Sequence, residues 1–115
     1  MNNNITNYIT YCLAESGRYS LKSDIPAEQI AIFSDSLFFQ WQKEVVECAG
    51  AVRQVLKAEG KRYFVVANSS TFLMEDMRYI LESGLAKMAG HAFVYRSNWR
   101  GVPCLEGAAV VFEVI

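Results

Sequence analysis

The residues with the greatest capacity for chemistry are few and lie far apart in the sequence. His91 is the single histidine, and the three cysteines are Cys12, Cys48 and Cys104. A zinc site needs several Cys, His or carboxylate ligands at coordinated spacing, and a nucleophilic thiol needs a base beside it. The sequence provides neither pattern. It therefore predicts no metal site, no cofactor and no catalytic residues, and we do not expect an enzyme. We interpret His91 as the first residue of a strand, directly after a helix that ends at Gly90.

A short polar turn is the candidate site for a small anionic ligand. It consists of Asn68, Ser69, Ser70 and Thr71, between a predicted strand and a predicted helix. Free backbone N–H groups and the helix dipole favour an anion at such a position. The turn contains no glycine, however, and helix capping explains the same residue types. Ligand binding here is the alternative hypothesis for function, and a sensor domain is the class of protein that it implies.

The stretch from Tyr95 to Arg100 combines aromatic side chains with arginine. Arg96, Trp99 and Arg100 are candidate contact residues for a partner protein, because Trp, Tyr and Arg dominate protein–protein hot spots. The same residue types also stack on single-stranded nucleic acid, and Trp99 alone could instead fold back over the core. The chain has eleven basic and twelve acidic residues and a net charge of −1. This balance disfavours nucleic acid as the partner, because phosphate contacts need a positive surplus.

Hydrophobic periodicity predicts two N-terminal helices, the second of them long. The first covers residues 5–16 and is ended by Gly17. The second begins at Pro26, continues to Glu59 as one long or gently kinked helix, and stops at Gly60. A break around Ser34, Asp35 and Ser36, where a cap could restart the helix, is the alternative.

The long predicted helix carries a second apolar stripe. Ile32, Phe39 and Val46 are spaced seven apart and fall outside its main apolar face. We call these three residues the seam. The first helix, a second copy of the chain or a different protein could cover the seam, and self-association as a homodimer is one expectation.

The second half of the chain predicts a βαββ unit. The strands are expected at residues 61–67, 91–96 and 108–115, and the helix at 72–88. Strand 61–67 is apolar on both faces from Tyr63 onward, as in a covered central strand. The last strand is expected to return antiparallel after a long irregular connection. The predicted fold class is α+β: two N-terminal helices, the second long, followed by a βαββ unit that forms a small mixed sheet packed against helices.

Composition limits the remaining possibilities. A chain of 115 residues with 52% hydrophobic residues predicts a single domain over 1–115, with residues 1–4 disordered. It has no apolar run of membrane-spanning length and no signal peptide, so no membrane association is expected. Three separated cysteines favour reduced thiols and a cytoplasmic location. We predict a small cytosolic, non-catalytic protein-binding regulator or inhibitor, of the class that includes immunity proteins, antitoxins and phage- or plasmid-type modulators.

Overall fold

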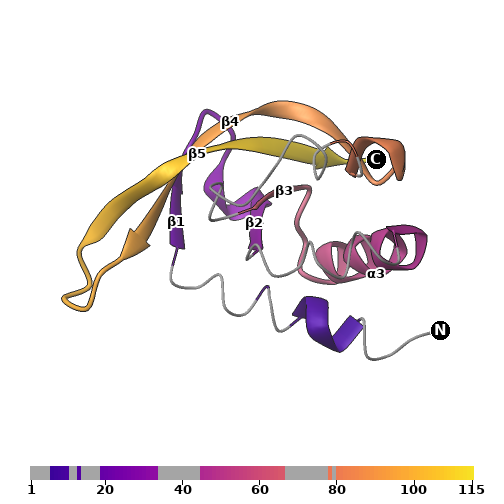
Figure 1. Ribbon diagram of the computed structural model, residues 1–115, viewed down its shortest axis with the longest axis horizontal. Helices are drawn as coiled ribbons and strands as arrows, with labels where there is room; N and C mark the ends of the chain where they lie inside the picture. The colour runs from indigo at the N-terminus through magenta and orange to yellow at the C-terminus, as the bar shows by residue number, and fades with distance from the viewer. Residues whose placement is uncertain (1–5, 11–12, 14–18, 34–44, 67–77, 79) are drawn as a thin grey trace.

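A five-stranded mixed sheet forms the centre of the computed structural model (Figure 1). The structure describes residues 6–10, 13, 19–33, 45–66, 78 and 80–115. The strands are β1 (Tyr19–Lys22), β2 (Ile30–Phe33), β3 (Tyr63–Val66), β4 (Ala86–Ser97) and β5 (Pro103–Val114). The labelled helices are the 3₁₀ turn η2 (Ala27–Gln29) and the α-helix α3 (Val45–Ala58). Residues 6–10 and 80–82 are also helical.

The strand order across the sheet is β1-β4-β5-β3-β2. β2 and β3 are parallel and are connected through the segment that contains α3, whereas β4 and β5 form an antiparallel hairpin. β5 is antiparallel to β3 as well, so the predicted antiparallel return of the last strand is confirmed. The short connection of residues 23–29 links β1 to β2 at the opposite edge of the sheet. This arrangement places the long hairpin between the two short edge strands.

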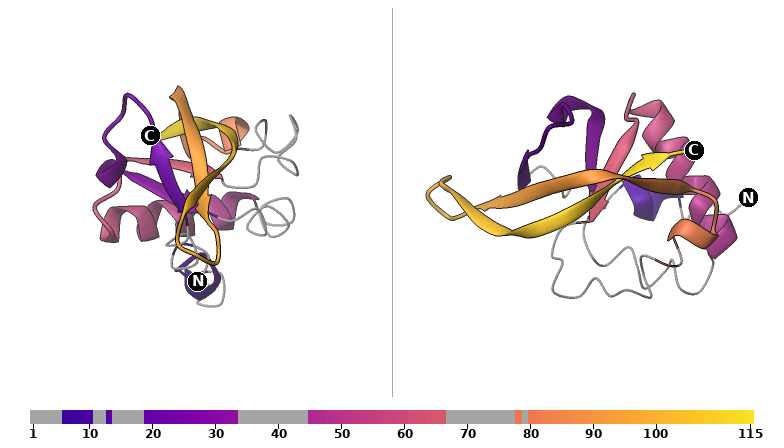
Figure 2. Two further views of the ribbon diagram at one scale, coloured as in Figure 1. Left: turned by 90° about the vertical axis from the view of Figure 1, so that its left-hand side faces the viewer. Right: turned by 90° about the horizontal axis from the view of Figure 1, so that it is seen from above.

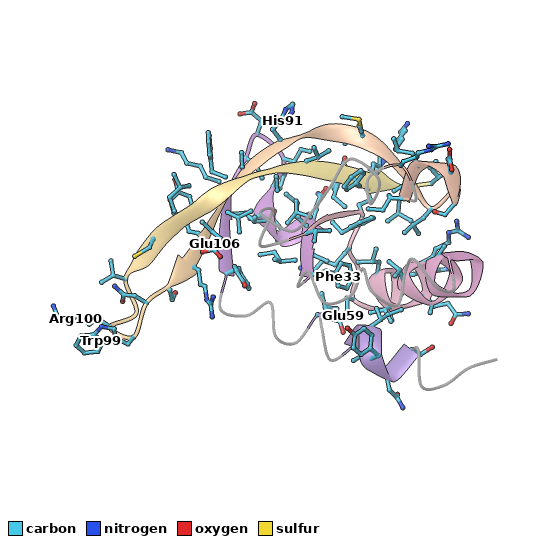
Figure 3. All side chains as sticks on the ribbon, in the orientation of Figure 1. Phe33, Glu59, His91, Trp99, Arg100 and Glu106 are labelled. Carbon is cyan, nitrogen blue, oxygen red and sulfur yellow. The ribbon has the colours of Figure 1, made fainter. Side chains whose placement is uncertain are left out.

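The larger core lies between the sheet and α3. Phe33, Phe64 and Phe112, from three neighbouring strands, are fully buried and face Val52 and Leu56 of the helix (Figure 3). The ring centroids of Phe64 and Phe112 are 5.3 Å apart in a stacked arrangement, and those of Phe33 and Phe64 are 5.9 Å apart edge to face. Such aromatic pairs add to the stability that burial of the apolar surface provides.

The opposite face of the sheet carries a second core. Val65, Ala92, Val94 and Val111 are buried there with Ile32, and Ile25 from the β1–β2 connection packs against them. Because strand side chains alternate between faces, Phe64 belongs to the first core and its neighbour Val65 to the second. The prediction that this strand is covered on both faces is therefore confirmed.

The prediction of two N-terminal helices, the second long, is wrong. Residues 6–10 are helical, but Tyr19–Lys22 and Ile30–Phe33 are strands, and α3 begins only at Val45 in the described part of the chain. A run of four apolar residues such as Ile30–Phe33 fits a buried strand as well as a helix. The decisive interaction is not local: this run pairs in parallel with β3, from Ile30 opposite Tyr63 to Phe33 opposite Val66.

The end of α3 agrees with the sequence. Gly60 has a φ of 68°, and its N–H donates to the carbonyl of Lys57, while the N–H of Lys61 donates to the carbonyl of Leu56. This is the Schellman arrangement that a glycine after a helix favours. The predicted stop at Gly60 is confirmed.

The predicted helix over residues 72–88 is too long at its C-terminal end. Helical backbone ends at residue 82, Gly84 has a φ of 73°, and β4 already begins at Ala86. Gly90 lies inside β4, next to a bulge at Ala89. His91 is consequently an exposed residue within a strand and not the first residue after a helix. Its backbone carbonyl accepts a hydrogen bond of 2.8 Å from Ser23 Oγ.

Candidate functional site: the projecting hairpin arm

The distal half of the β4–β5 hairpin extends beyond the rest of the molecule. We call residues 95–105 the arm; it projects along the longest axis, and its tip is far from α3 (Figures 1 and 2). β1 supports only the base, since Tyr19–Lys22 pairs with Phe93–Arg96. β3 pairs with β5 only at Glu113 and Phe112. The arm therefore presents its side chains on a two-stranded ribbon that is held at one end.

The tip of the arm is a hydrogen-bonded turn built around Asn98. The Asn98 side-chain oxygen accepts hydrogen bonds from the backbone N–H groups of Arg100, at 2.8 Å, and Val102, at 3.0 Å. The Asn98 backbone N–H donates to the Val102 carbonyl, and the Gly101 N–H donates to the Asn98 carbonyl. Gly101 has a φ of 77°, a conformation that glycine adopts without a steric cost. Local chemistry thus fixes the shape of the tip.

This turn exposes Trp99 to an unusual degree. The residue is 86% exposed and lies at the extreme end of the arm (Figure 3). The guanidinium carbon of Arg100 is 4.5 Å from the Trp99 ring centroid, within the range of a cation–π interaction. The interpretation that Trp99 covers the core is therefore wrong. Of the three predicted partner-contact residues, Trp99 and Arg100 are adjacent at the tip.

The third predicted contact residue, Arg96, lies at the base of the arm. Its guanidinium is 5.9 Å from the ring centroid of Tyr19, the residue opposite it on β1. Arg96 and Arg100 are the only charged residues of the arm, which therefore carries two positive charges. The structure brings all three predicted residues onto one projecting element.

A shallow hollow adjoins the base of the arm. Phe93 and Tyr95 of β4 line it together with Leu105 of β5, and its volume is about 490 Å³. Lys22, Ser23, Asp24 and His91 form the polar part of its lining. Phe93 is 52% and Leu105 61% exposed. An apolar surface of this kind, rimmed by polar groups, is typical of a protein interaction site.

The outer edge of β5 has features that oppose pairing with another strand. Pro103 lacks a backbone N–H, and Glu106 is an extra residue in β5, because Val94 pairs with Gly107 while Tyr95 pairs with Leu105. Proline, a charged side chain and a bulge are the usual means by which proteins protect an edge strand. This edge is therefore poorly suited to backbone pairing with another strand.

The residues of the seam do not lie on one helix, as the prediction of the seam required. Ile32 is in β2 and is almost completely buried in the second core, whereas Val46 is in α3. Phe39 lies outside the described residues. Ile32 and Val46 thus do not share one helix face, so the spacing of seven no longer supports an interface between two copies.

Of the remaining sequence candidates, one thiol lies on the arm. Asn68, Ser69, Ser70 and Thr71 lie outside the described residues, as does Cys12. Cys104 is free and exposed on the arm, and its thiol donates to the Val102 carbonyl at 3.7 Å. Among the residues that the structure describes, no group of three or more His, Cys, Asp or Glu side chains could hold a metal ion. None of the described helices is long and apolar enough to cross a membrane.

Sequence reasoning missed Phe93, Leu105 and the role of Asn98. Phe93 and Tyr95 alternate with the buried Ala92 and Val94, and this period of two is the signal that could have assigned them to an exposed face. Asn98 and Gly101 have the spacing of a turn in which a side chain caps the backbone.

Comparisons with known proteins give no further assignment. No protein-family model matches the chain, and neither a curated protein nor a solved structure is significantly similar to it. The candidate function therefore depends on the geometry of the arm.

Proposed function

We propose that this chain is a small, non-catalytic regulator or inhibitor that binds a target protein through its arm. The observation that carries the proposal is the exposed Trp99, held at the end of a projecting hairpin by a hydrogen-bonded turn. Tryptophan and arginine contribute the largest energies at protein interfaces when they enter a pocket of the partner. A tip that is already ordered loses little conformational entropy on binding.

The hollow beside the arm extends the proposed contact surface. A partner that receives Trp99 can also cover Phe93 and Leu105, which are more than half exposed. Burial of such apolar side chains contributes about 25 cal/mol for each Å² removed from water. The proposed compartment is the cytosol, because a free exposed thiol such as Cys104 suits reducing surroundings. Self-association stays a prediction that sedimentation must test.

The test is capture of target proteins from cells of the native host on immobilised chain, followed by titration of the purified target. Trp99→Ala is expected to weaken binding by about tenfold or more. Met88→Ala is the matched control, because Met88 is a 52% exposed apolar residue on β4 outside the arm. Thermal melting verifies that both variants are folded. Equal binding by wild type and Trp99→Ala would overturn the proposal.

A further inference from the structure

In the described part of the chain, three arginines lie beside aromatic rings. Arg62 is 5.9 Å from the ring centroid of Tyr63, Arg96 is 5.9 Å from that of Tyr19, and Arg100 is 4.5 Å from that of Trp99. A guanidinium that contacts a ring uses its flat face, so the N–H groups at its edge stay available to an anion. These edges are suited to the two oxygens of a carboxylate.

One of these arginines already holds its carboxylate. Arg62 Nη2 donates to Glu113 Oε2 at 3.1 Å, and Glu113 Oε1 is also 3.7 Å from Lys87 Nζ. The Arg62 guanidinium thus lies beside an aromatic ring and also donates to a glutamate. Arg62 is therefore an example, within this protein, of an arginine that contacts both an aromatic ring and a carboxylate.

The two arginines of the arm have no carboxylate partner among the described residues. Neither Arg96 nor Arg100 forms an ion pair with any residue in the described part of the chain. The arm contains no acidic residue. Arg100 lies beside Trp99 at the tip (Figure 3), and Arg96 lies at the base, opposite Tyr19. Within the described residues, both arginines are therefore available to a carboxylate of another molecule.

We propose that the arm recognises an acidic segment of its partner protein, in which Asp or Glu side chains bind the edges of Arg96 and Arg100. An apolar side chain of the same segment packs against Trp99 and Val102, which are both exposed. This inference rests on the proposed function and specifies the chemistry of the partner.

Electrostatics favours a protein segment over nucleic acid. A phosphodiester chain is held by many phosphate contacts, and the arm offers only two guanidinium groups. Glu106 at the base of the arm and Asp24 in the hollow would repel a continuous line of phosphates. A peptide with a few carboxylates and one apolar anchor can place its charges at the two arginines only, so it meets less of this repulsion than a continuous line of phosphates.

A selection of short random peptides displayed on phage, with the full chain as the target, tests the proposal. The selected peptides are then synthesised, each with a twin in which Asp and Glu are replaced by Asn and Gln. We expect the selected peptides to be rich in Asp and Glu, and the twins to bind at least about tenfold more weakly. Arg100→Gln and Arg96→Gln are expected to cause losses of the same order. Lys57→Gln on α3 changes the net charge equally and is expected to leave binding unchanged.

The other outcomes separate this inference from the proposed function. If the selected peptides are not acidic but fail to bind Trp99→Ala, the arm is a binding site and the proposal that it recognises an acidic segment is wrong. Peptides that bind Trp99→Ala and Arg100→Gln as well as wild type would overturn both proposals. Binding of an oligo-dT strand that is lost in Arg100→Gln, with no acidic peptide selected, would assign the arm to nucleic acid. Failure to select any peptide would overturn recognition of an acidic segment.

Discussion

Two hydrogen bonds join Asn98 to Val102 across the tip of the arm: the Asn98 backbone N–H donates to the Val102 carbonyl at 2.9 Å, and the Val102 N–H donates to the Asn98 side-chain oxygen at 3.0 Å. Trp99 and Arg100, which lie between them together with Gly101, are exposed. The shape of the tip thus depends on one asparagine, through its side chain and its backbone.

Replacement of that side chain tests the order of the tip. Asn98→Ala removes the side-chain oxygen that accepts hydrogen bonds from the Arg100 and Val102 N–H groups. Each of these hydrogen bonds is worth about 1 kcal/mol. We expect faster hydrogen exchange of these two amides and weaker partner binding. The free energy of unfolding is expected to fall by no more than about 2 kcal/mol, because the turn is distant from both cores and the substitution leaves no buried cavity.

Asn98→Asp is the matched control, since it retains an oxygen at the accepting position. We expect the exchange rates of the Arg100 and Val102 amides to remain close to wild type. Equal exchange in the alanine and wild-type proteins would contradict the structural role of Asn98.

Two Gly→Ala substitutions are expected to change stability in opposite directions. Gly101 has a φ of 77°, where an alanine costs about 1–2 kcal/mol. Gly50 lies in α3, and a Cβ there meets no atom within 4 Å, so alanine is expected to stabilise the helix by about 1 kcal/mol. Urea denaturation of both variants measures the two free energies. A stabilising Gly101→Ala would show that the tip has a different backbone conformation.

Phenylalanine substitutions distinguish the core from the arm surface. Phe64 is fully buried between Phe33 and Phe112, so Phe64→Ala is expected to destabilise the protein by about 3–5 kcal/mol. Phe93→Ala, at a 52% exposed position on β4, is expected to cost much less in the same urea titration. Comparable losses in the two variants would be inconsistent with the exposed position of Phe93.

The ion pairs of Glu113 are expected to contribute little to stability. Its partners Arg62 and Lys87 are 70% and 66% exposed, and exposed pairs are worth about 0–1 kcal/mol. Glu113→Gln should therefore lower the free energy of unfolding by less than about 1 kcal/mol, and the difference should decrease in high salt. A loss that is several times larger and independent of salt would disprove this estimate.

Removal of the edge protection on β5 is expected to promote association. A variant with Pro103→Thr and Glu106 deleted gains a backbone N–H and loses both the charge and the bulge. Sedimentation velocity at several concentrations should show larger species for this variant than for wild type. Pro26→Thr, at the start of η2, is the control for loss of a proline elsewhere. Identical sedimentation of all three proteins would mean that Pro103 and Glu106 do not protect this edge.

Several elements could be predicted because their signals are local. The β-branched run at Tyr63–Val66 forms β3, the predicted strands at 91–96 and 108–115 fall largely within β4 and β5, and Gly60 ends α3. The mixture of Trp and Arg likewise led to the choice of Arg96, Trp99 and Arg100 as candidate contact residues, which stays a prediction. Residue type and short-range periodicity carry this information, because they reflect backbone preference and the chemistry of single side chains.

The errors arose where contacts between distant residues decide the conformation. Ile30–Phe33 has the apolar spacing of a helix face, but it is a strand because β3 provides hydrogen-bond partners for its backbone and both cores bury its side chains. Ala86–Gly90 continues a helical pattern in sequence, but it pairs with Val111–Val114 of β5. Pairing between backbone segments so far apart in the sequence cannot be recognised from the pattern of a short stretch of residues.

The sequence by itself determined the turn residues, the central strand β3 and the residue types that can bind a partner. Only the tertiary structure decided that β1 and β2 are edge strands and that the hairpin extends beyond its neighbours. It also decided that, among the described residues, Arg62 has a carboxylate partner whereas Arg96 and Arg100 have none. The physical reason is that exposure and charge pairing depend on which strands lie side by side. That order is set by burial and hydrogen bonding across the whole sheet.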